Sequence, residues 1–145
     1  MKAKNKLSKS VFWITFILSF SFNVDVALGQ NWEAPASANA LKNPFKGNAA
    51  ALTEGKTLYT SMCVVCHGAT GKGNGEASVT LSPQPANFLS IKVEDESDGA
   101  IFWKLTNGKP PMASYQDLLT DAQRWKLVTY IRSLEENNKS NGKKK

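Results

Sequence analysis

The stretch that decides the fold is residues 55–68, GKTLYTSMCVVCHG. Within it, Cys63 and Cys66 are three positions apart, and His67 follows directly. Two thiols at this spacing, at the end of a helix, can reach the two vinyl groups of one porphyrin. The adjacent imidazole then projects toward the iron from the same side. Because C-x-x-C-H is typical of haem attachment, we predict one covalently bound haem c with His67 as an iron ligand.

Three other uses of a cysteine pair compete with this interpretation. A structural disulfide would suit an exported protein, but it gives no reason for histidine at the next position. A thioredoxin-like redox pair expects a βαβ setting, which this sequence does not suggest. A zinc site usually takes four ligands from Cys and His, and the chain holds two Cys and one His in total. Haem attachment is therefore the favoured interpretation.

The sole histidine also limits the second axial position of the iron. Because His67 has no counterpart in the chain, the remaining candidates are Met, Lys, water or another weak donor. The first methionine belongs to the leader, and Met62 directly precedes the motif on the same side of the haem. Met112 lies in a loop stiffened by two prolines, with 44 residues between it and His67. A lone Met is more often a core residue, but this placement favours Met112 as the ligand.

The pattern of caps and apolar positions predicts helices and no strands. The expected helices run from Ala49 to about Ser61 after an Asn48 N-cap, from Ser97-Asp98 to Asn107-Gly108, and onward from a capping box at Thr120 and Gln123. Gly55 falls in the middle of the first helix, where glycine is unfavourable. We therefore expect another helix to cross closely at Gly55. Without β-alternation or an internal repeat, the fold class is all-α.

The N-terminus has the pattern of a secretory signal. Residues 1–10, MKAKNKLSKS, are basic, and residues 11–22, VFWITFILSFSF, are apolar. Ala27-Leu28-Gly29 then supplies small residues for cleavage before Gln30. An uncleaved membrane anchor is the alternative, although the apolar run is short for a membrane span. We predict a signal peptide over residues 1–29 and a periplasmic protein, associated with the membrane if the leader is retained.

The two remaining segments flank the predicted domain. Residues 30–48 lack a helical or strand period and are predicted to form an extended arm. Some of that arm is expected to cover the domain, because Trp32, Leu41 and Phe45 are costly to expose. Residues 137–145 form a polar, basic tail that we expect to be disordered. Residues 30–138 carry 10 Lys/Arg against 11 Asp/Glu, so nothing indicates a nucleic-acid-binding face.

Over roughly residues 49–136 the sequence resembles the class I c-type cytochromes, in their small single-haem bacterial form. The resemblance is carried by GKTLYTSMCVVCHG, by LTNGKPPMASY at residues 105–115 and by WKLVTYIRSL at residues 125–134. It implies three to five helices wrapped round one haem. It also implies that the first and last helices cross through Gly55 and Tyr59 on one side and Tyr130 or Trp125 on the other.

The resemblance further implies a proline carbonyl that accepts the hydrogen bond of the proximal histidine. Pro85 matches best, with Pro83 as the competitor, and such a bond orients the imidazole and strengthens it as a donor to iron. One departure concerns the axial loop. Many relatives have Met followed by Pro, whereas here Met112 follows Pro111.

These expectations lead to a function. Two axial side chains leave no open iron site, which suits a single-electron carrier in a respiratory or periplasmic dehydrogenase chain, with redox proteins as donor and acceptor. The alternative is a cytochrome c subunit docked permanently in a larger membrane-bound respiratory complex. An enzyme is disfavoured. A di-haem peroxidase needs a second motif, and gas-binding four-helix cytochromes place the motif near the C-terminus, whereas 78 residues follow His67 here.

Overall fold

The computed structural model describes residues 32–142. Its helices, in chain order, are α1 (Ala36–Asn39), α2 (Ala49–Met62), α3 (Val64–His67), the 3-10 helix η1 (Glu76–Thr80), α4 (Ile91–Glu94), α5 (Asp98–Asn107) and α6 (Asp121–Gly142). This part of the chain contains no strand, only an isolated bridge between Lys109 and Met112. The predicted all-α fold class is confirmed. The predicted leader, residues 1–29, lies outside the described residues.

The three long helices begin where their caps predict. The Asn48 side chain accepts a hydrogen bond of 2.9 Å from the N–H three residues on, and Ser97 does the same at 3.0 Å. Before α6, the Thr120 N–H donates to Gln123 Oε1 at 2.9 Å and the Gln123 N–H donates to Thr120 Oγ1 at 3.3 Å. Each cap satisfies N–H groups that have no partner within the helix. These starts are local properties of the sequence.

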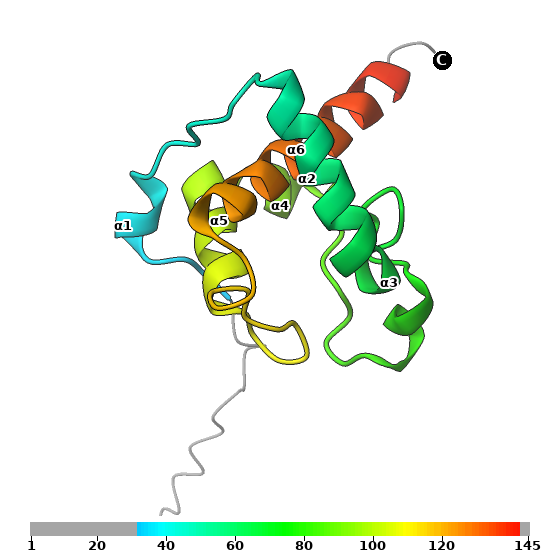
Figure 1. Cartoon of the computed structure of the whole chain (residues 1–145). Coiled ribbons are helices and arrows are strands. Elements are labelled where there is room, and N and C mark those ends of the chain that lie inside the picture. The colour runs from blue at the N-terminus through cyan, green and yellow to red at the C-terminus, as the bar shows by residue number, and fades with distance from the viewer. Residues whose placement is uncertain (1–31, 143–145) are drawn as a thin grey trace, which may run out of the picture. The chain divides into compact units, whose positions relative to one another are not determined.

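Helices α2 and α6 cross (Figure 1), and Gly55 lies at their closest approach. A Cβ atom added at Gly55 would lie 2.1 Å from the Lys126 carbonyl oxygen, so only glycine allows this approach. One turn later, the rings of Tyr59 and Tyr130 lie 5.1 Å apart. The predicted close crossing is confirmed, with Tyr130 as the aromatic partner. Trp125 stacks instead on Phe102 of α5, with ring centroids 4.1 Å apart.

The core lies beneath this crossing. Tyr59, Leu127 and Val128 are its largest fully buried side chains. Around them pack buried side chains from α5, α6 and the segment between them (Ile101, Leu105, Leu119, Trp125 and Ile131). The core therefore joins the end of α2, which carries the cysteine motif, to α5, which leads into the loop of Met112.

The arm is more structured than predicted. It contains α1, whose Ala38 is buried, and a Cβ added at Gly99 of α5 would lie 1.9 Å from the Ala38 carbonyl oxygen. Phe45 packs on the core as expected, and Leu41 is only partly covered, with 44% of its surface exposed. A helix of four residues is too short to show a helical period in the sequence. Its stability comes from packing on Gly99 and not from its own sequence pattern. The arm then passes α5 and α6 to the start of α2 (Figure 1).

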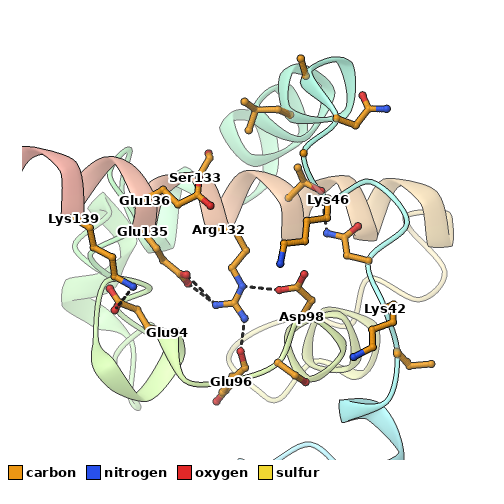
Figure 2. Close-up of a pocket in the computed structure, with 18 of the residues that line it drawn as sticks. Lys42, Lys46, Glu94, Glu96, Asp98, Arg132, Ser133, Glu135, Glu136 and Lys139 are labelled. Atoms are coloured by element: carbon orange, nitrogen blue, oxygen red, sulfur yellow. Dashed lines mark hydrogen bonds and ion pairs between the residues drawn. The ribbon is translucent and has the colours of Figure 1, made fainter.

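The prediction of a disordered tail over residues 137–145 was wrong for residues 137–142, and residues 143–145 lie outside the described residues. Helix α6 continues to Gly142. Once a helix is nucleated, each added residue gains one backbone hydrogen bond. Lys139 Nζ further ties the extension to Glu94 of α4 at 2.9 Å (Figure 2). Among the described residues, no helix combines the length and the apolarity needed to cross a membrane.

Candidate functional site

The cysteine motif forms one tight turn at the end of α2. Cys63 still donates its N–H to the Tyr59 carbonyl at 2.8 Å, and its own carbonyl accepts the His67 N–H at 2.8 Å. Cys66 and His67 belong to the single turn of α3. Both cysteines are free thiols, and Cys63 and His67 are buried. The structure therefore brings the three predicted motif residues together on one short helical segment.

The His67 imidazole is fixed in orientation by a backbone carbonyl and an aromatic ring. Its Nδ1 lies 3.1 Å from the Ala86 carbonyl oxygen, and its ring stacks on Phe88 at 4.4 Å and 18°. Burial lowers the pKa of His67, and the hydrogen bond to Ala86 opposes that shift. The ring is therefore neutral near pH 7. With Nδ1–H donating to Ala86, the lone pair of Nε2 remains for a metal.

The hydrogen-bond acceptor predicted from the resemblance was wrong by one residue. Ala86, and neither Pro85 nor Pro83, accepts from His67. The Pro85 carbonyl faces Gly73 instead: a Cβ added at Gly73 would lie only 2.3 Å from that oxygen. Of two successive carbonyls, only one can face the imidazole. Pro85 thus belongs to the segment that supports His67, but its own oxygen does not make the bond.

A glycine-rich loop, residues 68–75, connects the motif to this supporting segment. The Gly73 N–H donates to the His67 carbonyl at 2.9 Å, and the Phe88 N–H donates to the Gly71 carbonyl at 2.8 Å. Gly71 and Gly73 both have φ of +74°, a region that side chains disfavour. The Tyr59 hydroxyl donates to the Gly68 carbonyl at 2.7 Å. The loop was expected to be irregular, but its function of holding the histidine support was missed.

The environment of Cys63 argues against a thiol redox pair. Burial raises the pKa of the Cys63 thiol to about 11, and a hydrogen bond with Tyr115 offsets this only in part. A thiol of that pKa is protonated near pH 7, whereas a redox-active cysteine needs a depressed pKa and access. The Cys63 thiol therefore lies beside the imidazole as an unactivated group.

Met112 approaches the site on a separate segment. Gly108 ends α5 with φ of +63°. A turn then closes round the two prolines, with hydrogen bonds of 3.0 Å from Lys109 N–H to the Met112 carbonyl and 2.8 Å in the reverse sense. The Met112 side chain is partly buried and packs against the core cluster. In Figure 1 this loop (yellow) lies across from α3 and the glycine-rich loop (green).

The donor set fits haem and does not fit an isolated metal ion. In residues 32–142 there is no group of three or more His, Cys, Asp or Glu side chains able to hold a metal. The structure instead holds two free thiols and one imidazole nitrogen on one helical turn, and the thioether of Met112 on a separate loop that packs on the same core. A His/Met-ligated haem c requires donors of these kinds. Partly buried apolar side chains from α2, α3, α5 and the loops pack against the core cluster that contains Cys63 (Leu58, Met62, Val64, Phe88, Phe102 and Tyr115).

Comparison with known proteins agrees with this donor set. Residues 50–131 match the family described as cytochrome c oxidase, cbb3-type, subunit III. Cytochrome c6 of Rippkaea orientalis (strain PCC 8801 / RF-1) is 35% identical over 85 residues, which cover 59% of this chain and 69% of that protein. The chain belongs to the class I c-type cytochrome family. Membership implies haem c and electron transfer between redox partners.

A solved structure is also similar to the cytochrome. A chain of the Kuenenia stuttgartiensis reducing HAO-like protein complex Kustc0457/Kustc0458 superposes with a TM-score of 0.58 at 27% sequence identity. The similarity covers 66% of the cytochrome and 48% of that chain. The cytochrome therefore corresponds to about half of its structural neighbour.

The contact between Gly73 and Pro85 gives a testable prediction for the cytochrome. We expect Gly73→Ala to lose about 1–3 kcal/mol of unfolding free energy, because the added Cβ must displace the Pro85–Ala86 backbone. The displaced Ala86 carbonyl would weaken His67 as a donor, so the reduction potential should rise. Denaturant unfolding and a redox titration measure the two effects.

Gly47→Ala is the matched control for this substitution. Gly47 also has positive φ, +77°, but a Cβ there meets nothing within 4 Å. Its backbone strain costs about 1 kcal/mol, and the reduction potential should not change. Equal effects of the two substitutions on the potential would contradict the support assigned to the Pro85–Ala86 segment.

Proposed function

We propose that the protein is a single-electron carrier with one haem c, attached through Cys63 and Cys66 and ligated by His67 and Met112. The observation that carries this proposal is the buried His67 imidazole, oriented by the Ala86 carbonyl beside two free thiols. When bound, the haem supplies a reversible change of one electron at its iron.

The surrounding residues suit electron transfer better than catalysis at iron. A side chain on each axial position leaves no site for a substrate, so we propose that the protein is not an enzyme. The Ala86 hydrogen bond makes His67 a stronger donor, and a methionine sulfur opposite it raises the potential. The two loops that carry these residues are closed by backbone hydrogen bonds and packed on one core. Little rearrangement is then needed between the two oxidation states.

We further propose that the carrier acts in the periplasm, within a respiratory or dehydrogenase chain. The signal-like pattern of residues 1–29 supports export. Donor and acceptor are then redox proteins of that compartment, and the membrane takes part indirectly or through a retained leader. Nucleic acid is not among the proposed partners, because the near balance of charge over residues 30–138 provides no basic face.

A docked subunit is the second candidate function. Its support is the description of the matching family, which names an oxidase subunit, and the structural neighbour, which is a chain of a complex. Residues 32–48 lie outside the family match and add surface that a partner could contact.

Covalent attachment can be tested on a denaturing gel. Because thioether bonds survive unfolding, the protein produced with c-type maturation should keep its haem stain, with one haem per chain by pyridine haemochrome assay. The Cys63→Ala/Cys66→Ala double variant should lose the stain while retaining its sequence-derived mass. Loss of haem from the unmodified protein on the gel would refute the attachment.

The axial assignment can be tested by comparing two methionines. Met112→Ala should abolish the weak long-wavelength absorption band of a sulfur–iron bond in the oxidised protein. It should also lower the reduction potential, by on the order of 0.1 V. Met62→Ala is the control, since Met62 ends α2 beside Cys63 and lies with the His67 side of the site. Persistence of the band in Met112→Ala would contradict the assignment.

Native separation distinguishes the two candidate functions. A free carrier solubilised from its own cells should migrate near its 15.8 kDa mass, or somewhat below it after leader cleavage. A docked subunit should elute with a larger haem-containing assembly under mild detergent. Migration only in such an assembly would favour the subunit over the free carrier.

A further inference from the structure

The segment that follows Met112 is bound by one buried arginine of α6. Arg124 is only 4% exposed, and its Nη1 donates to the carbonyls of Tyr115 at 3.1 Å and of Gln116 at 3.0 Å. The same nitrogen donates to the Leu119 carbonyl. One guanidinium group therefore holds three carbonyls of a single five-residue stretch, residues 115–119, which begins three positions after Met112.

An ion pair does not account for the burial of Arg124. Its only carboxylate partner among the described residues is Asp121, whose side chain is 81% exposed. The Arg124 Nε is buried and makes no hydrogen bond, and the guanidinium lies 5.3 Å from the Phe102 ring centroid. Burying a cation costs free energy unless polar groups surround it. Here those groups are mainly the loop carbonyls, so Arg124 holds the loop through its hydrogen bonds.

Tyr115 ties the same stretch to two more helices. Its N–H donates to the Leu105 carbonyl of α5 at 3.0 Å. Its hydroxyl donates to the carbonyl of Met62, the residue before Cys63, at 3.4 Å. The third residue after Met112 is thus joined to α5, to α6 through Arg124, and to the end of α2 beside the first attachment cysteine. The predicted axial methionine and the predicted attachment site are linked through one side chain.

We propose that Tyr115 and Arg124 are positioning residues that hold the Met112 loop against α2 and α6 and so set the strength of the Met112 sulfur–iron bond. This inference rests on the function proposed above. A methionine sulfur is a weak, neutral ligand that competes with added donors for the iron. The loop must therefore be held in place by contacts other than the bond itself. Arg124 supplies such contacts from α6, and Tyr115 supplies them from within the stretch itself, to α2 and α5.

Arg132, eight residues further along α6, provides a matched control. It is also largely buried, and its guanidinium donates to Asp98 at 2.7 Å and to Glu135 at 2.9 Å and to the carbonyl of Glu96 (Figure 2). Its partners belong to α6, to the start of α5, to α4 and to the segment between α4 and α5. Arg132 thus has a comparable polar network on the same helix but makes no hydrogen bond with residues 108–119.

The test compares Tyr115→Phe, Arg124→Lys and Arg132→Lys in the haem-loaded protein. Lysine keeps the charge but loses the planar, multiple-donor group. Three properties are measured: the thermal midpoint, the sulfur–iron absorption band and the affinity of the oxidised protein for added imidazole, which displaces a weak methionine ligand. We expect Tyr115→Phe and Arg124→Lys to raise the imidazole affinity by roughly fivefold or more, the change that follows from losing about one hydrogen bond. Arg132→Lys should lower the thermal midpoint without changing the imidazole affinity.

The outcomes separate this inference from the proposed function. Absence of the sulfur–iron band in the unmodified protein overturns the proposed Met112 ligation and the inference with it. If the band is present but Arg124→Lys and Tyr115→Phe bind imidazole no better than Arg132→Lys, only the inference is overturned. Should Arg124→Lys fail to yield folded holoprotein, Tyr115→Phe decides alone, because it removes a single hydroxyl and leaves the Leu105 contact intact.

Discussion

The approach of α6 to Gly55 is the constraint on which the rest of the structure depends. With the Lys126 carbonyl in the space that a Cβ at Gly55 would fill, the two longest helices touch backbone to backbone. Helix α2 then delivers Cys63 and His67 at its end. Helix α6 delivers Arg124 to the loop of Met112, two residues before Lys126, whose carbonyl meets Gly55. The positions of both sides of the candidate site therefore depend on the same contact, that between Gly55 and Lys126.

The parts of the structure that follow from local chemistry could be predicted from the sequence. Asn48, Ser97 and Thr120 bond N–H groups within three residues, so each helix start is encoded where it occurs. The cysteine motif is equally local, because its function depends on spacing along one turn. Gly55 indicated a tertiary contact, since glycine is unfavourable inside a helix unless close packing requires it.

The parts that escaped prediction depend on tertiary contacts. Helix α1 forms where Gly99, which has no side chain, lets the Ala38 backbone pack closely on α5. The carbonyl that orients His67 is that of Ala86, since the Pro85 carbonyl faces Gly73. A sequence pattern identifies the supporting segment but not which of two neighbouring carbonyls turns inward. Arg124 did carry a signal that was missed. It lies four residues before Val128 and seven before Ile131, so a cation occupied the apolar face of α6.

The two sides of the candidate site are therefore held in different ways. On the histidine side, the backbone itself provides the support, through the Ala86 carbonyl and the backbone hydrogen bonds of the glycine-rich loop. On the methionine side, the loop is anchored by two side chains, the hydroxyl of Tyr115 and the guanidinium of Arg124. Backbone support is hard to change by substitution without disturbing the fold. Side-chain support can be altered one atom group at a time, so the methionine side is where a protein of this design can adjust its ligand strength while the attachment stays fixed.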